Sequence, residues 1–120
     1  MINIDFRDKR PLYEQICSKL EELILNGVIK ANEPLPSVRS LAIELSINPN
    51  TIQKAYSFLE QKGLIYSISG RGSFAADTAD ILPAKKKEIF DELRTLFAKA
   101  YALGITKEEL HQVIEGEENK

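Results

Sequence analysis

The chain has 120 residues, of which 43% are hydrophobic and 28% are charged, a balance typical of a folded globular protein and not of a disordered one. This length allows one hydrophobic core and a small appendage. The net charge of −2 excludes attraction to nucleic acid through total charge alone. Residues 1–76 carry nine basic and eight acidic residues, whereas the remainder carries seven and ten. Any positive field must therefore come from the arrangement of the charges.

Cys17 is the single cysteine, which excludes an internal disulfide and favours a reducing compartment. It lies in an apolar helical pattern and is expected to be a small core residue, not a nucleophile. The N-terminal segment MINIDFRDKR carries charges where a signal peptide needs a continuous apolar run. No stretch has the length of a membrane span. We therefore expect a cytoplasmic protein without a membrane partner.

Apolar residues at helical spacing predict two helices in the first half of the chain. The first begins near Pro11 and stops at Asn26-Gly27. Residues 28–36 form a connector that its prolines keep extended. Ser37 then caps the second helix, SVRSLAIEL. Ahead of these helices, alternating apolar residues predict an extended arm that lies on the body of the protein. The apolar positions of this arm are Ile2, Ile4 and Phe6.

The stretch from Asn48 to Gly63 predicts a third helix with one apolar and one polar face. Asn48 is a suitable N-cap, Pro49 suits the first helical position, and Gly63 suits a left-handed C-terminal turn. Asparagine and glutamine amides both donate and accept hydrogen bonds, so the polar face suits base edges in a DNA groove, although a solvated surface helix has the same pattern. The apolar face is formed by Ile52, Ala55, Tyr56 and Leu59. The polar face is formed by Asn50, Gln53, Lys54, Ser57 and Gln61.

Two short helices joined by a tight turn at Ser46-Ile47, the second with a polar front, are typical of a helix-turn-helix. The residues that follow predict a β-hairpin over 64–75, with its turn at Gly70-Arg71-Gly72. An arginine at this tip is placed to reach phosphates or a narrow minor groove. The alternative is a solvated turn residue.

Residues 77–84 predict a short linker closed by Pro83. Beyond it, apolar residues recur at steps of four and three residues, which is a heptad-like pattern. Gly104 ends this helix, and Thr106 with Glu109 has the spacing of a capping box at the start of a last helix. The two helices carry more apolar surface than their own hairpin can cover. Packing on the front domain and packing against a second copy are both open. The residues predicted for the dimer contact are Ile89, Leu93, Leu96, Phe97, Ala100 and Tyr101.

Four blocks, PLYEQI, LPSVRSLA, NPNTIQKAYSFLEQKGLI and GRGSF, resemble the GntR family of bacterial transcription regulators. The short two-helix tail resembles the YtrA-like subfamily, which carries no large effector domain. The resemblance implies a fold that is mainly α with a small β-hairpin (α+β). This fold is a winged helix-turn-helix DNA-binding domain over 1–76, the linker over 77–84, and a helical hairpin for dimerisation over 85–120. Pro49 and Gln53 stand where many relatives outside this branch carry arginine, so base preference does not transfer from them.

The resemblance also implies a function: repression by a homodimer that binds a dyad-symmetric DNA operator. The helix over 49–62 would lie in the major groove and the wing at the minor groove. Carried over by position, the residues expected to contact DNA are Ser37, Arg39, Asn48, Asn50, Thr51, Gln53, Gly70 and Arg71. The polar face of the third helix adds Lys54 to this set.

An enzyme is disfavoured because the single histidine, His111, lies far in sequence from Cys17. The sequence contains no metal-ligand cluster, no phosphate-binding glycine loop and no nucleophilic triad. We therefore expect no catalysis, no metal and no cofactor. The alternative function is a winged helix that binds a protein partner without DNA. The salt dependence of binding distinguishes the two functions, because phosphate contacts weaken steeply as the salt concentration rises. A small-molecule effector could sit near Phe97 or Tyr101, but no convergent polar groups indicate one.

Overall fold

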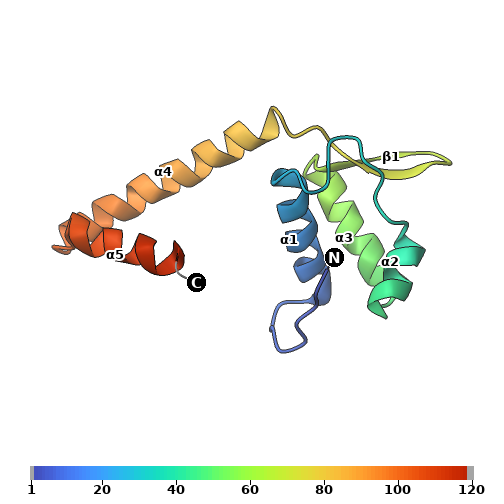
Figure 1. Cartoon of the computed structure of the whole chain (residues 1–120), viewed down its shortest axis with the longest axis horizontal. Helices are drawn as coiled ribbons and strands as arrows, with labels where there is room; N and C mark the ends of the chain where they lie inside the picture. The colour runs from blue at the N-terminus through green and yellow to red at the C-terminus, as the bar shows by residue number, and fades with distance from the viewer. Residues whose placement is uncertain (1, 119–120) are drawn as a thin grey trace. The chain divides into compact units, whose positions relative to one another are not determined.

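The computed structural model describes residues 2–118, which form five helices and one two-stranded antiparallel sheet (Figure 1). The chain divides into two compact units, Met1–Asp80 and Ile81–Lys120. The predicted fold class, mainly α with a small β-hairpin, is confirmed. In the part of the chain that is described, no helix combines the length and the apolar character that crossing a membrane requires. The elements are α1 (Leu12–Leu25), α2 (Val38–Leu45), α3 (Pro49–Gln61), β1 (Ile65–Ile68), β2 (Gly72–Ala75), α4 (Ile81–Ala102) and α5 (Lys107–Glu118).

The core of the first unit forms where α3 packs against α1, α2 and β1, and Figure 1 shows α3 between α1 and α2. Full burial of one aliphatic side chain stabilises a fold by about 1.5–3 kcal/mol. The buried face of α3 is the apolar face predicted from the sequence, so its rotation about the helix axis is fixed and its polar face must meet solvent. The largest fully buried side chains are Ile16, Leu20, Leu41, Ile52, Leu59 and Leu64.

Side chains cap the starts of α2 and α3 at the residues that the sequence predicts. The Ser37 Oγ accepts a hydrogen bond from the Ser40 N–H at 3.0 Å. The Asn48 Oδ1 accepts one from the Asn50 N–H at 2.8 Å. α1 begins after Pro11 without a side-chain cap. One such cap contributes about 1 kcal/mol of stability, and here two caps define the ends of the helix-turn-helix.

Tyr56 is buried in the core, as the sequence predicts, and its hydroxyl has a partner there. The hydroxyl donates a hydrogen bond to the Pro36 carbonyl oxygen at 2.6 Å. Burial raises the pKa of Tyr56 to about 12, so the phenol stays protonated and remains a donor. This bond joins α3 to the connector directly before α2.

The hairpin predicted after α3 is confirmed, with β1 and β2 paired antiparallel. The register places Tyr66 opposite Phe74, and their rings stack at 5.6 Å between centroids. The strands are joined by residues 69–71. Aromatic cross-strand pairs of this kind stabilise a short hairpin.

The connector ahead of α2 pairs along the outer edge of β2, which the sequence pattern does not reveal. The Leu35 N–H donates to the Ser73 carbonyl at 2.9 Å, and the Ala75 N–H donates to the Glu33 carbonyl at 2.9 Å. The Asn32 N–H also donates to the Ala75 carbonyl, at 2.7 Å. The wing is therefore bonded to the segment that leads into the helix-turn-helix.

The N-terminal arm differs from the prediction. Ile2 is buried, but Phe6 is 76% exposed, so only the start of the arm lies on the body. The Asp5 carboxylate accepts a hydrogen bond from the Arg7 N–H at 2.9 Å, a local turn that competes with an extended backbone. The Gln15 side chain accepts from the Asp5 N–H at 3.2 Å and so ties the arm to α1.

In the second unit, α4 begins inside the predicted linker 77–84. Pro83 lies in its first turn, where a missing N–H has no intrahelical partner to lose. α4 ends at Ala102, and Gly104 follows it with a φ of +82°, which agrees with the predicted stop of this helix at Gly104. The capping box is present as well, because the Thr106 Oγ1 accepts from the Glu109 N–H at 3.2 Å and the Glu109 Oε1 accepts from the Thr106 N–H at 3.0 Å. The predicted domain boundaries otherwise remain a prediction, and residues 1, 119 and 120 lie outside the described part.

Replacing Tyr56 with phenylalanine leaves the Pro36 carbonyl without its donor. We expect the free energy of unfolding at pH 7 to fall by about 1 kcal/mol, typical of one hydrogen bond. Because the pKa of Tyr56 is about 12 in the folded chain and about 10 in an unfolded one, the wild-type protein loses about 1.4 kcal/mol per pH unit between those values, and the variant does not. The variant's deficit therefore shrinks at high pH.

Urea unfolding at neutral and at alkaline pH measures this difference. Tyr66→Phe is the control, since the Tyr66 hydroxyl donates to the Asn32 side chain on the exposed surface. Equal stability of Tyr56→Phe and the wild-type protein at both pH values would contradict the role assigned to this hydroxyl.

Candidate functional site

The face of α3 opposite the core is polar and open to solvent. Asn50, Gln53 and Lys54 are exposed, and Thr51 is partly buried. The Gln53 Nε2 donates to the Ser57 Oγ at 3.4 Å, which holds the amide along the helix surface. The four residues predicted on α3 are thus brought together within its first two turns.

Ser37 and Asn48 are both exposed, and each already has a structural role as a helix cap. The Ser37 hydroxyl also donates to the Ser40 Oγ at 2.9 Å, so its proton is engaged. The side-chain oxygen Oδ1 of Asn48 accepts the capping hydrogen bond, which leaves the side-chain nitrogen Nδ2 as a donor. A contact from either residue to another molecule stays a prediction.

Two exposed arginines lie on elements next to this helix, α2 and the hairpin. Arg39 lies in the first turn of α2. Arg71 lies at the tip of the hairpin between Gly70 and Gly72, whose φ angles of +78° and +104° favour glycine. The Arg71 N–H donates to the Ile68 carbonyl at 2.9 Å and closes the turn. Among the described residues, no carboxylate forms an ion pair with either arginine.

Several other cations of the first unit are paired with acidic neighbours. Arg10 pairs with Asp8 at 2.9 Å, and its guanidinium holds the pKa of that carboxyl below its usual range. Lys62, at the end of α3, pairs with Glu21 of α1 at 3.5 Å. These cations are therefore paired, whereas Arg39 on α2 and Arg71 on the wing have no ion pair among the described residues.

A groove of about 430 Å³ lies between the starts of α1 and α3 and contains a residue that the sequence analysis did not select. Tyr13 lines it, and the Lys54 Nζ lies 3.9 Å from the centroid of the Tyr13 ring. The contact is between residues far apart in sequence, and the only signal for it is that Tyr13 falls in the PLYEQI block. The residues that line the groove are Pro11, Leu12, Tyr13, Asn50, Thr51 and Lys54.

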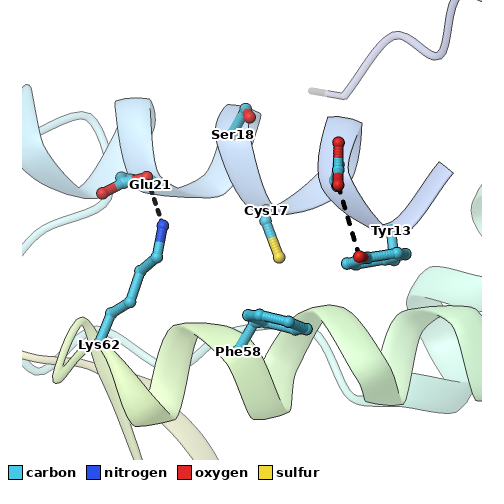
Figure 2. A pocket seen from close by; sticks show the side chains of 7 residues that line it. Tyr13, Cys17, Ser18, Glu21, Phe58 and Lys62 are labelled. Atoms are coloured by element: carbon cyan, nitrogen blue, oxygen red, sulfur yellow. Dashed lines mark hydrogen bonds and ion pairs between the residues drawn. The ribbon is translucent and has the colours of Figure 1, made fainter. Parts of the chain in front are cut away.

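A second groove, of about 260 Å³, lies further along the same two helices (Figure 2). Figure 2 shows Tyr13 and Phe58 on opposite walls and Lys62 directed at Glu21. Cys17 is buried beneath the groove, and its Sγ lies 3.3 Å from the Ala55 carbonyl oxygen. Burial raises the pKa of the Cys17 thiol, which disfavours the nucleophilic thiolate and supports a packing role.

The sequence model of the family described as "Bacterial regulatory proteins, gntR family" matches residues 12–74. The chain belongs to the GntR family. It is 40% identical over 116 residues to the HTH-type transcriptional repressor YtrA of Bacillus subtilis (strain 168), covering 95% of this chain and 89% of that protein.

Two solved structures extend the comparison. A GntR family transcriptional regulator from Listeria monocytogenes superposes with a TM-score of 0.74 at 32% identity, covering 92% of this chain and 98% of that one. AraR(DBD) in complex with operator ORR3 superposes with a TM-score of 0.52 at 28% identity, covering 62% of this chain and 92% of that one. This GntR-family protein is therefore a transcriptional regulator with a DNA-binding winged helix-turn-helix, and not an enzyme.

In the tail of this GntR-family protein, the residues predicted for dimerisation lie on the surface. No residue of α4 is buried. Ile89, Leu96 and Tyr101 are 55%, 57% and 47% exposed, which is far from the burial expected of a core helix. Phe97 and Ala100 are partly buried, and Leu93 is exposed. Further large apolar side chains are exposed on α4, on α5 and at the turn between them: Phe90, Leu103, Val113 and Ile114.

The place proposed from sequence for an effector, near Phe97 and Tyr101, is a groove of about 260 Å³ between α4 and α5. Lys107 and His111 of α5 also line this groove. The sequence analysis had not predicted polar side chains at this place. Among the described residues, no group of three or more histidine, cysteine or acidic side chains is arranged to hold a metal ion.

Replacing Asn48 with aspartate separates its capping role from a role at DNA. The carboxylate retains the acceptor for the Asn50 N–H, so we expect the free energy of unfolding to change by less than about 0.5 kcal/mol, whereas Asn48→Ala loses about 1 kcal/mol. DNA affinity should fall in Asn48→Asp because a negative charge would face the phosphates.

Asn26→Asp is the matched control, since it makes the same charge change at the far end of α1. Urea unfolding and fluorescence anisotropy with a labelled duplex measure the two effects. Equal loss of affinity in both aspartate variants would indicate a general charge effect and not a local one.

Proposed function

We propose that this protein is a sequence-specific repressor that binds a dyad-symmetric operator as a homodimer. The observation that carries the proposal is the polar face of α3, exposed because its other face is buried, with unpaired arginines on the adjoining elements. Two similarities support it: YtrA is named a repressor, and AraR(DBD) is seen in complex with an operator. Because operator DNA must be reached, we also propose a cytoplasmic location.

In this proposal α3 lies in the major groove and reads base edges through Asn50 and Gln53. Asparagine and glutamine form bidentate hydrogen bonds with adenine, and one good pair contributes about 1–3 kcal/mol of discrimination. Both side chains are exposed on the same face, three residues apart, so they can reach neighbouring base pairs.

Phosphate contacts surround this reading face. The start of α3 presents the positive end of the helix dipole, and Thr51 and Asn48 lie there. Ser37 and Arg39 occupy the corresponding first turn of α2. Lys54 adds a cation one turn after Asn50. These contacts position the protein on the duplex, whereas α3 selects the sequence.

The wing completes the interface at the adjacent minor groove. Gly70 allows the backbone to turn tightly, and Arg71 projects from the tip without an acidic partner among the described residues. An arginine suits a narrow minor groove because the negative potential is enhanced there. The hydrogen bonds between β2 and the connector hold the wing in place relative to α2.

The second unit supplies the homodimer contact. Its exposed apolar residues form a face that a single copy leaves in water, and a second copy of the same helix would bury it. We therefore assign DNA binding to residues 1–76 and dimerisation to residues 85–120. Linking two half-sites raises operator affinity through effective concentration.

Replacing Arg71 with alanine should weaken binding to every DNA sequence, because a phosphate-directed cation is lost. The slope of log K against log salt should become shallower by about 0.9 per protomer. Anisotropy titrations over a series of salt concentrations, on a duplex selected by the wild-type protein from a random pool, measure this slope. The matched control is Lys62→Ala, since Lys62 is already paired with Glu21. An unchanged slope in Arg71→Ala would remove the wing from the interface.

Replacing Leu96 with glutamate should yield a monomer, because it places a charge in the proposed dimer contact while the side chain is 57% exposed in one copy. Operator affinity should fall by more than about tenfold, since the second half-site is no longer tethered. Analytical ultracentrifugation reports the oligomeric state. The control is Thr95→Glu, because Thr95 lies about 100° around α4 from Leu96, on the side away from most of the predicted contact residues. A Leu96→Glu dimer, or salt-insensitive binding by the wild-type protein, would contradict the proposal, and the latter would favour a protein-binding module.

A further inference from the structure

Tyr13 makes two contacts with α3 through the same aromatic ring. The Lys54 Nζ lies 3.9 Å from the ring centroid, a cation–π geometry. The ring also stacks on Phe58, with centroids 5.4 Å apart and planes inclined by 25°. Phe58 lies one helical turn after Lys54, so the ring spans a full turn of α3. Figure 2 shows Tyr13 and Phe58 facing each other across the space between the two helices.

The Tyr13 ring is held in turn by its own surroundings. It is partly buried, and its hydroxyl donates to the Glu14 Oε1 at 3.4 Å. The hydroxyl contact is long and contributes little, but a ring that is partly buried and stacked on a neighbour has little rotamer freedom left. It can therefore hold a flexible partner such as Lys54 in one place.

Lys54 pairs with an aromatic face and not with an acid. Among the described residues, no carboxylate forms an ion pair with its ammonium group, whereas Lys62, two turns later, pairs with Glu21. An ammonium group has three donors, and contact with a ring face consumes none of them in a bond to oxygen. The Lys54 cation is thus ordered while its hydrogen-bonding capacity is retained.

The site at which Lys54 is held adjoins the DNA-reading residues. Asn50, Thr51 and Lys54 line one groove together with Tyr13. Lys54 lies four residues after Asn50, on the same exposed face of α3. A phosphate beside the start of α3 would therefore lie within the range of this ammonium group.

We propose that Tyr13 is a positioning residue for DNA binding: its ring holds the Lys54 ammonium group in place to contact a backbone phosphate. A lysine loses much rotamer freedom when it binds, and ordering it beforehand lowers that cost. The inference rests on the proposed binding of DNA by α3. In this proposal α1, which carries Tyr13, contributes to DNA affinity although it contacts no bases.

The test uses the full chain and the duplex selected from a random pool. Tyr13→Phe keeps the ring and should bind as the wild-type protein does. Tyr13→Leu and Tyr13→Met remove the ring and should weaken binding by about two- to fivefold per protomer, the range set by an exposed cation–π contact. Their salt dependence should also become shallower.

A double-mutant cycle shows whether Tyr13 acts through Lys54. In a Lys54→Gln background, Tyr13→Leu and Tyr13→Met should cause no further loss of affinity. Phe58→Leu removes the stack that helps to hold the ring but keeps the Tyr13–Lys54 pair, so its loss of affinity should be smaller than that of Tyr13→Leu and should vanish in the Lys54→Gln background. Equal losses from Tyr13→Leu in both backgrounds, or tighter binding without the ring, would overturn the proposal.

Nuclear magnetic resonance of the free wild-type protein gives a second readout that needs no variant to fold. The Lys54 ε-methylene protons should be shifted upfield by the ring current of Tyr13, and an unshifted signal would overturn the proposal. Failure of the underlying function is distinguishable, because it would remove salt-dependent DNA binding from the wild-type protein itself. If only the positioning role is wrong, DNA affinity will still fall steeply with salt, and it will be equal in the wild-type protein and all the Tyr13 variants.

Discussion

The burial of one face of α3 is the constraint on which the rest of the structure depends. Ile52, Ala55, Tyr56 and Leu59 are all buried against α1, α2 and the start of the hairpin. A helix turns by about 100° per residue, so a shift of a single position would bring polar side chains into the core at a cost of several kcal/mol. The direction in which Asn50 and Gln53 point is thus a consequence of hydrophobic packing on the other side. One helix therefore carries the proposed recognition residues on one face and core residues on the other.

A small number of polar contacts convert this packed helix into a rigid frame. The Tyr56 hydroxyl bonds the Pro36 carbonyl, and the segment just before Pro36 pairs with β2. The same short connector is therefore attached to α3 on one side and to the wing on the other. Since α2 starts at the end of this connector, the three elements that carry the proposed contacts share one anchor. An unbonded connector would leave the wing free to move relative to α3.

Local signals in the sequence were sufficient for much of this fold. The caps at Ser37 and Asn48, the capping box at Thr106 and the glycines of the hairpin turn each act within a few residues, and they lie where they were predicted. The features that were missed depend on residues far apart in sequence. The pairing of the connector with β2 and the contact of Lys54 with Tyr13 leave no periodic pattern in the sequence.

The prediction of an extended N-terminal arm was wrong because a local turn at Asp5 outweighed the alternating pattern that predicts an extended backbone. Pro83 was predicted to close a linker over 77–84, but α4 begins at Ile81, and a proline in the first turn of a helix loses no hydrogen bond.

Charge explains how a chain with a net charge of −2 can present a surface for a polyanion. Pairing matters more than the total, because a lysine bound to a glutamate contributes little field beyond its own ion pair. In the first unit Lys62 is paired with Glu21, whereas Arg39 and Arg71 have no ion pair among the described residues. Lys54 is ordered by a neutral ring, which positions the cation without cancelling it. In the proposed homodimer each of these cations would act twice, once at each half-site.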